Sequence, residues 1–279
     1  MEKKDEKFNK IIPKIYPVLE EEPDPRIFNK PIHPNMIQPY SLVIGVGQVK
    51  SGKTCCINNI MLRTREEGFL DAQDTFDQSV IISNTIGNDP SARFLKKAFE
   101  VQDHYTDGYI TKFIQKQDSY GEKKDMPYTC MILDDILGRN MKRNNDISFL
   151  ATRYRHKNIG LLGIFVQNYK SLDTILRNNC TDWLIYKQTN TKSFLQIAEE
   201  LHGVYGSMEN FVKLYKYATS VPYGFLYLKI QDGKALRSFE EVIFEDGKML
   251  IPDSPTEKDI EKIINPEKPT KDKDIEETK

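Results

Sequence analysis

The sequence predicts an α/β fold, in which a mostly parallel sheet is flanked by helices. Two observations predict it. Strand-like and helix-like segments alternate along the chain, which is the pattern of parallel strands joined by crossover helices. Several strand-like segments are also continuous apolar runs, as expected of strands that helices cover on both faces.

The expected elements follow one another in a regular order. Strands are predicted at 41–46, 79–84, 129–134, 159–166, 182–187 and 224–230. Helices are predicted at 53–66, 91–100, 144–155, 170–177, 192–203 and 208–217. The segment after residue 224 has a hairpin-like ending, which is compatible with additional antiparallel strands at one edge of the sheet.

Proline marks the limits of the regular structure, because it fixes φ and removes a backbone donor. Seven of the 14 prolines lie in residues 1–40, and four more lie after residue 251. We therefore predict a proline-rich extended arm over 1–40, one folded domain over 41–251 and a charged, disordered tail over 252–279.

Composition restricts the class of protein. The chain has 279 residues with 39% hydrophobic residues, enough for a substantial core, and its net charge of −1 excludes a globally basic DNA-binding protein but leaves room for a local basic channel. The longest apolar run, Ile159–Val166, is far shorter than the roughly 20 residues that span a bilayer. The charged start of the chain lacks the apolar core of a secretory signal. We expect a protein that is neither secreted nor membrane-spanning, with its four cysteines as free thiols.

Residues 47–54 match the phosphate-binding pattern G-x-x-x-x-G-K-[ST] at every constrained position. The context fits as well, because a predicted strand leads into the loop and a helical segment follows it. Lys53 is expected to reach the β- and γ-phosphates, and the Thr54 hydroxyl to bind Mg²⁺. Without nucleotide, the Lys53 ammonium is expected to face solvent. The predicted nucleotide-binding residues are Gly47, Gln48, Val49, Lys50, Ser51, Gly52, Lys53, Thr54 and Cys55.

A second acidic site is predicted where an apolar strand ends in Asp134 and Asp135. Asp134 would hold Mg²⁺, as the acidic partner of a P-loop does. Asp135 would point to the opposite side of the strand end, where it could orient or deprotonate the attacking water. The plainer interpretation, that Asp135 only caps the following turn, stays open.

Polar and basic residues surround the fourth strand. Gln167 follows its carboxyl end, where side chains face the ligand crevice of open α/β sheets, so it could contact the γ-phosphate or the water. Arg155 belongs to the basic stretch 139–158 before the strand, and Arg177 follows the next predicted helix. Both arginines are candidates for fingers that reach a neighbouring subunit's γ-phosphate. Contacts to DNA phosphates and a solvated surface remain the alternatives for the basic stretch.

The order of these motifs resembles the poxvirus-type virion DNA-packaging ATPases of the FtsK–HerA superfamily. The resemblance covers roughly residues 40–230, and its most specific part is 153–182, with "RHKNIGLLGIFVQNYKSL" and "ILRNNCTDW". Many relatives in the superfamily have Asp-Glu where this chain has Asp134-Asp135.

The resemblance implies a P-loop NTPase fold of the RecA-like, ASCE type and ATP with Mg²⁺ as ligands. It also implies translocation of double-stranded DNA, without sequence preference, into a preformed capsid. The superfamily works as homo-oligomeric rings, usually hexamers. Such a ring would act in the host cytoplasm and the virion, against capsid or inner-membrane components.

Three other functions remain as alternatives. A nucleoside or nucleotide kinase would share the P-loop but should carry an arginine-rich lid. A non-enzymatic assembly protein with a degenerate nucleotide site would not need the intact Lys53, Thr54 and Asp134. A GTP-binding switch lacks a persuasive N-K-x-D motif after a strand. ATP is favoured by the resemblance, because a P-loop does not read the base.

Overall fold

A computed structural model describes residues 31–86, 89–136 and 145–251. The predicted arm lies outside these residues up to residue 30, and the predicted tail lies outside them entirely. The boundary at residue 40 stays a prediction. The structure adds that Met36 and Ile37, within the predicted arm, are buried. Lys229 donates from Nζ to the carbonyl oxygens of Pro34 (2.6 Å) and Met36 (3.3 Å).

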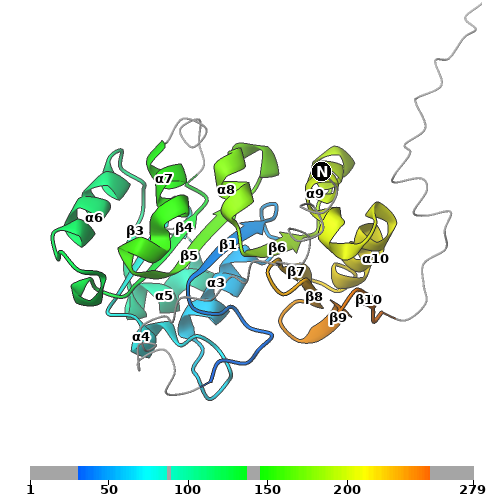
Figure 1. The fold of residues 1–279 in the computed structure, drawn as a ribbon, viewed down its shortest axis with the longest axis horizontal. Coiled ribbons are helices and arrows are strands. Elements are labelled where there is room, and N and C mark those ends of the chain that lie inside the picture. Colours follow the sequence, from blue (N-terminus) through cyan, green and yellow to red (C-terminus); the bar gives the residue numbers. More distant parts are fainter. Residues whose placement is uncertain (1–30, 87–88, 137–144, 252–279) are drawn as a thin grey trace, which may run out of the picture. The chain divides into compact units, whose positions relative to one another are not determined.

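A ten-stranded sheet forms the centre of the described domain, in the order β10-β9-β8-β7-β6-β1-β5-β4-β2-β3 (Figure 1). The strands are β1 (Ser41–Val46), β2 (Gln78–Ser83), β3 (Glu100–Gln102), β4 (Thr129–Asp134), β5 (Ile159–Val166), β6 (Asp182–Tyr186), β7 (Phe225–Lys229), β8 (Lys234–Arg237), β9 (Glu241–Glu245) and β10 (Lys248–Met249). Strands β3, β2, β4, β5, β1 and β6 are parallel. Strands β6 to β10 pair antiparallel. The α/β prediction and the antiparallel edge are both confirmed.

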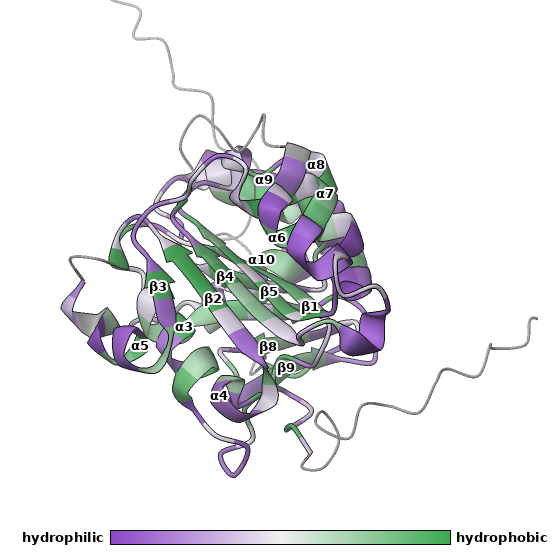
Figure 2. Ribbon diagram, turned by 90° about the vertical axis from the view of Figure 1, so that its left-hand side faces the viewer, coloured by the Kyte–Doolittle hydropathy of each residue, from purple (hydrophilic) through white to green (hydrophobic). Residues whose placement is uncertain are grey.

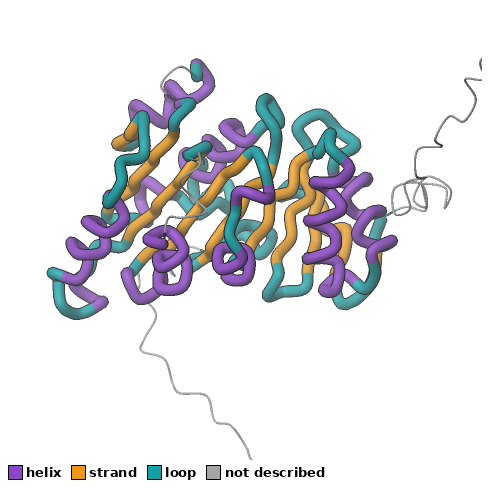
Figure 3. Tube along the Cα trace, turned by 90° about the horizontal axis from the view of Figure 1, so that it is seen from above, coloured by secondary structure: helices purple, strands orange, loops and turns teal. Residues whose placement is uncertain are grey.

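Helices cover both faces of the sheet. They are α3 (Lys53–Leu62), α4 (Ala72–Thr75), α5 (Arg93–Ala98), α6 (Tyr109–Asp118), α7 (Asn145–Arg153), α8 (Thr174–Asn179), α9 (Thr191–Leu201) and α10 (Met208–Ala218). Helices α3, α4 and α5 lie on one face, and α6 to α9 lie on the other (Figure 2). The tube view shows the strands side by side between these helices (Figure 3). None of the described helices is long and apolar enough to cross a membrane.

Burial explains the apolar runs. The strands β1, β4 and β5 are buried along their whole lengths. One large cluster of buried side chains joins alternate residues of β1, among them Leu42, Ile44 and Val46, to helices α6 to α10. This rigid parallel core fixes where each strand ends, and therefore where the polar residues that follow the strands are placed.

Side-chain caps define where helices α8, α9 and α10 begin. Asp173 accepts a hydrogen bond from the Leu176 amide at the start of α8 (2.9 Å). Asn190 accepts bonds from two amides at the start of α9, and Ser207 accepts one at the start of α10. Such caps satisfy amide groups that the first helical turn leaves free. The ends of β5 and β6 are thus followed by helices with defined starting points.

Candidate active site at the carboxyl edge of the sheet

The P-loop curls tightly between β1 and α3. The Gly47 amide donates to the Val166 carbonyl of β5 at 3.0 Å, which ties the loop to the neighbouring strand. A Cβ atom at Gly47 would lie 2.5 Å from Oγ of Ser51, so a larger residue would not fit there. Gly52 caps α3 with a φ of 102°, in the left-handed region that favours glycine. The two glycines of the motif are therefore required by the shape of the loop.

The position of Lys53 contradicts the expectation that its ammonium faces solvent. Its side chain is only 6% exposed and does not face solvent. Its Nζ atom folds back over the loop and donates to the carbonyl oxygens of Gly47 (2.7 Å) and Gln48 (3.2 Å). A buried ammonium needs acceptors, and these two carbonyls supply them. Thr54 follows as the second residue of α3 and is half-buried, and Cys55 is exposed.

Asp134 ends β4 and is 3% exposed. Its Oδ2 atom accepts a hydrogen bond from Ser83, the last residue of β2, at 2.8 Å. Burial, followed by the charge of Asp135, raises the pKa of the Asp134 carboxyl to about 6, although the Ser83 hydrogen bond and the Lys53 charge oppose this shift. The carboxylate therefore lies in the field of the P-loop lysine, as the predicted Mg²⁺ ligand should.

Asp135 turns away from Asp134 toward β5. Its φ of 46° is left-handed, so the strand ends here and the backbone bends. Its Oδ2 atom accepts a hydrogen bond from Nε2 of Gln167 at 3.1 Å. The two carboxylates thus have different neighbours, Ser83 on β2 for one and Gln167 after β5 for the other. Gln167 lies between the P-loop and the carboxylates because β5 pairs with both β1 and β4.

Three buried oxygen atoms of this site have no hydrogen-bond partner among the described residues. They are Oγ of Ser51, Oδ1 of Asp134 and Oδ1 of Asp135. Buried polar atoms are nearly always paired, so unpaired ones need an explanation. A hydrated cation and a phosphate would supply donors and positive charge to these oxygens. The residues present therefore fit a metal–nucleotide complex.

Two polar residues of the site were not singled out from the sequence. Ser83 ends β2 and holds Asp134. Gln188 follows β6 and donates from Nε2 to the carbonyl oxygens of Val46 (3.1 Å) and Tyr186 (3.0 Å), next to the P-loop. Beside it, Thr189 donates to Oε1 of Gln48 at 2.9 Å. The reasoning that identified Gln167, a polar residue at the carboxyl end of a buried strand, would have identified Ser83 and Gln188 as well.

Arg155 lies at the amino ends of the parallel strands, opposite the end that carries the P-loop. It precedes β5, and its Nε atom donates to the Tyr154 hydroxyl at 3.1 Å. That hydroxyl donates to the carbonyl oxygen of Tyr40, the residue before β1 (2.7 Å). The length of β1, about 20 Å for six residues, therefore separates Arg155 from the P-loop of its own chain. Arg155 is exposed and available to another molecule.

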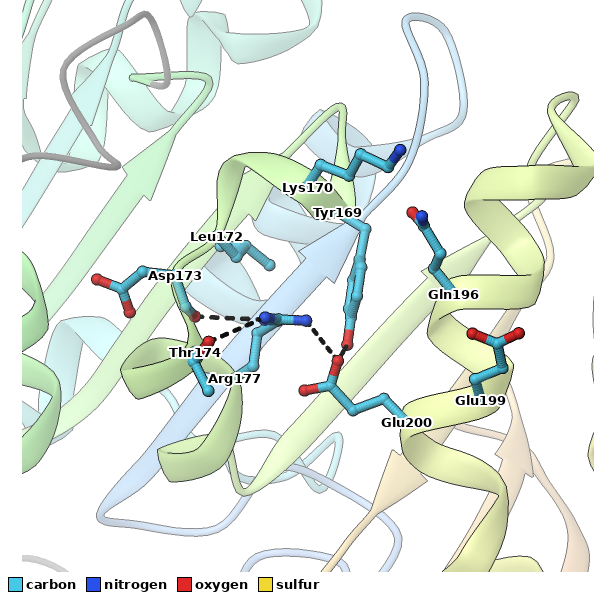
Figure 4. Close-up of a pocket in the computed structure, with 9 residues that line it drawn as sticks. All are labelled: Tyr169, Lys170, Leu172, Asp173, Thr174, Arg177, Gln196, Glu199 and Glu200. Carbon is cyan, nitrogen blue, oxygen red and sulfur yellow. Dashed lines mark hydrogen bonds and ion pairs between the residues drawn. The ribbon is translucent and has the colours of Figure 1, made fainter.

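Arg177 is held within its own chain, in a cavity between α8 and α9 (Figure 4). It forms an ion pair with Glu200 of α9, donates to the Thr174 hydroxyl at 3.1 Å, and lies 5.1 Å from the centre of the Tyr169 ring. The Tyr169 hydroxyl also donates to Glu200. The structure therefore does not bring Arg155, Arg177 and the P-loop together in one subunit. Their role as fingers stays a prediction.

The rest of the basic stretch 139–158 and an aromatic group on and between α9 and α10 are not part of this arrangement as far as the structure describes them. Arg139, Lys142 and Arg143 lie outside the described residues. The aromatic residues near Lys213 and Lys216 are mostly core, since Tyr205, Phe211 and Tyr215 are buried. Phe194 of α9 stacks on Tyr215 with the ring centres 4.1 Å apart. These aromatic side chains therefore pack helices α9 and α10 together and leave little ring surface on which nucleic-acid bases could stack.

Comparison with known proteins gives a likeness of fold. No protein-family model and no curated protein matches the chain. The structure is similar to B204, the DNA-packaging ATPase from Sulfolobus turreted icosahedral virus, with 16% identity and a TM-score of 0.51, covering 71% of this chain and 97% of B204. The genome packaging NTPase B204 from Sulfolobus turreted icosahedral virus 2, in complex with sulfate, gives 18% identity and a TM-score of 0.49 over 70% of this chain and 94% of that one. The first likeness shows that this chain has the P-loop ATPase fold of B204.

Proposed function

We propose that this chain is an ATP-hydrolysing motor that moves double-stranded DNA into a viral capsid. The observation that carries the proposal is the convergence of Lys53, Asp134, Asp135 and Gln167 at the carboxyl ends of the strands, with buried oxygen atoms that have no partner among the described residues. Support for DNA packaging comes from the sequence resemblance over 153–182 and from the shared fold with a protein described as a DNA-packaging ATPase.

Each residue has a defined chemical task in this proposal. The loop amides and Lys53 bind the phosphates, and the Lys53 ammonium exchanges its carbonyl acceptors for phosphate oxygens. Thr54 and Asp134 would hold Mg²⁺, which supplies positive charge to the β- and γ-phosphate oxygens. Asp135 accepts a proton from the attacking water or orients it, and Gln167 fixes the carboxylate of Asp135.

Movement of DNA requires more than one subunit. We propose a homo-oligomeric ring, as in the superfamily that the sequence resembles, whose basic loops contact the phosphate backbone. Phosphate contacts position a protein on DNA without reading its sequence, which suits a packaging motor. The ring would act in the host cytoplasm and in the virion, docked on capsid or inner-membrane components.

The test is the ATPase activity of the full chain with and without double-stranded DNA, together with a mass measurement of its assembly state. Lys53→Ala, which removes the phosphate-binding ammonium, is assayed beside the wild type to show that any hydrolysis comes from this site. We expect hydrolysis that DNA stimulates, from a multimer. A monomer whose phosphotransfer ignores DNA would instead support the kinase alternative. Absence of any hydrolysis, with nucleotide still bound, would support a non-enzymatic assembly protein.

A further inference from the structure

The turn between α10 and β7 places an aromatic residue in an unfavourable backbone conformation. The Gly224 amide donates to the Val221 carbonyl at 3.1 Å, which closes a four-residue turn with Pro222 at its second position. Tyr223, at the third position, has a φ of 61°. Turns of this type favour glycine or asparagine there, because a side chain makes the left-handed region costly.

Packing does not offset this strain. Tyr223 is 72% exposed, and within the described parts of the chain it makes no hydrogen bond or ring contact. Tyr40 provides the comparison, because it has a similar φ of 60°. The Tyr40 ring packs edge-on against Tyr128 with centres 5.7 Å apart, and its hydroxyl donates to Asn158 at 3.3 Å. Strain without a structural reason points to a function.

Tyr223 lies directly over the P-loop. A Cβ atom added at Gly52 would be 3.3 Å from Cβ of Tyr223 and 3.4 Å from its Cδ1 atom. The strand register agrees, because Phe225 of β7 pairs with Tyr186 at the carboxyl end of β6. Since β6 is parallel to β1, the turn before β7 shares its edge of the sheet with the P-loop.

The sheet order also decides which end of a nucleotide would meet this ring. Strand β4, which ends in Asp134, lies on one side of β1, beyond β5, and β7, which follows the turn with Tyr223, lies on the other side, beyond β6 (Figure 1). The γ-phosphate belongs on the side of the carboxylates, because they carry the reaction chemistry. The remainder of the nucleotide then extends toward Tyr223. Val221, in the same turn, is 43% exposed and adds apolar surface there.

We propose that Tyr223 stacks on the nucleobase of the bound nucleoside triphosphate. This inference rests on the proposed function, since it assumes that the P-loop binds a nucleotide. Stacking on an aromatic ring is available to every base, because every base has a π face. Tyr223 therefore contributes affinity and orientation, and it does not select adenine over guanine.

The experiment compares the full-length wild type with Tyr223→Phe, Tyr223→Ala and Tyr223→Gly. Calorimetry measures the binding of ATP and of inorganic tripolyphosphate, which lacks a base. We expect Ala and Gly to weaken ATP binding about 5- to 150-fold, the range of one base–aromatic stack. Tripolyphosphate binding should be unchanged in all variants, and Phe should bind ATP like the wild type.

Tyr223→Gly separates a binding role from a structural one. Glycine removes the ring and relieves the left-handed strain, so its unfolding midpoint in urea should not fall below that of the wild type. Wild-type ATP affinity in both Ala and Gly would overturn the stacking proposal and leave the proposed function standing. Equal losses for ATP and tripolyphosphate would also overturn it, because Tyr223 would then shape the P-loop. A wild-type chain that binds neither ligand would overturn the proposed function itself.

Discussion

At the scale of single residues, Lys53 serves both the fold and the chemistry, because its ammonium bonds two carbonyls of its own loop. We predict that Lys53→Ala abolishes hydrolysis and also lowers the free energy of unfolding by about 1–3 kcal/mol, since both acceptors lose a charged donor. ATPase assays and urea unfolding measure the two effects. Lys112→Ala, an exposed lysine on α6, is the matched control and should change neither. A folded Lys53→Ala protein with wild-type turnover would refute the P-loop assignment.

Substitutions of Asp134 and Asp135 should have different effects, because the two carboxylates contact different neighbours. Asp134→Ala should weaken Mg²⁺-dependent nucleotide binding, since Asp134 faces Ser83 and the field of Lys53. Asp135→Asn should keep nucleotide binding and lose turnover, since the amide cannot accept a proton from water. Binding titrations with and without Mg²⁺, beside single-turnover hydrolysis, distinguish these outcomes. Normal hydrolysis by Asp135→Asn would mean that another group is the base.

The sequence was informative about residues wherever a motif or a strand end defined them. The P-loop, Asp134, Asp135 and Gln167 follow strands whose apolar runs were visible, and the structure brings all four to one edge. The burial of Lys53 was not predictable, because it depends on the path of loop carbonyls in space. The position of Tyr223 over the P-loop was not predictable either, since the sequence pattern does not indicate a positive φ at a tyrosine.

At the scale of elements, strand β6 begins with a buried carboxyl group. Asp182 accepts hydrogen bonds from Tyr227 (2.7 Å) and Thr181 (2.6 Å), yet burial raises its pKa above the usual value. In the unfolded chain the pKa of an aspartate is about 3.9. Above that pH the native state holds more protons than the unfolded state until the native pKa is passed. Its contribution to the free energy of unfolding therefore falls as pH rises.

We predict that this dependence disappears in Asp182→Asn. The stability of the wild type relative to the variant should be higher at pH 4 than at pH 7, measured by urea unfolding at both values. Asp103→Asn, an exposed aspartate, should show no such difference. Equal offsets at both pH values would mean that Asp182 has an ordinary pKa in the native state.

Elements with a clear apolar pattern were easier to predict than short elements or those with few apolar residues. All six predicted strands occur, with limits within one residue. Most of them are continuous apolar runs because both of their faces are buried. Strand β3 has three residues at the sheet edge, too few for a pattern. Helix α6 was missed because its buried face has only two apolar residues, Ile110 and Phe113, beside Gln117, which is too few for a clear helical pattern.

At the scale of the whole molecule, neither predicted arginine finger lies at the P-loop of its own subunit in the part of the chain that the structure describes. Arg155 is exposed at the amino ends of the parallel strands, away from the P-loop, and Arg177 is paired with Glu200. Either arginine would serve a P-loop only by reaching that of a neighbouring chain. For Arg177 the ion pair with Glu200 would have to open first, which would link the finger to the position of α9.

Mixed assemblies test this arrangement. If Arg155 or Arg177 is a finger, its alanine variant should bind nucleotide normally and hydrolyse about 10³–10⁵ times more slowly. Mixing it with Lys53→Ala subunits should restore activity, because those subunits keep their arginines and can complete the intact P-loops of the others. Arg63→Ala, a surface arginine paired with Glu67, is the control and should hydrolyse normally by itself.

The same mixtures separate the competing roles of the two arginines. Restored activity requires shared interfaces, which a monomeric kinase does not have. Mixtures that co-assemble yet stay inactive for both variants would exclude a finger acting between subunits. Normal hydrolysis with a loss of salt-sensitive DNA binding would instead assign the arginines to the phosphate backbone of DNA, where each lost contact reduces the salt dependence of binding. In that case neither arginine would stabilise the negative charge of the transition state, and the ring would couple its subunits through DNA and not through a shared active site.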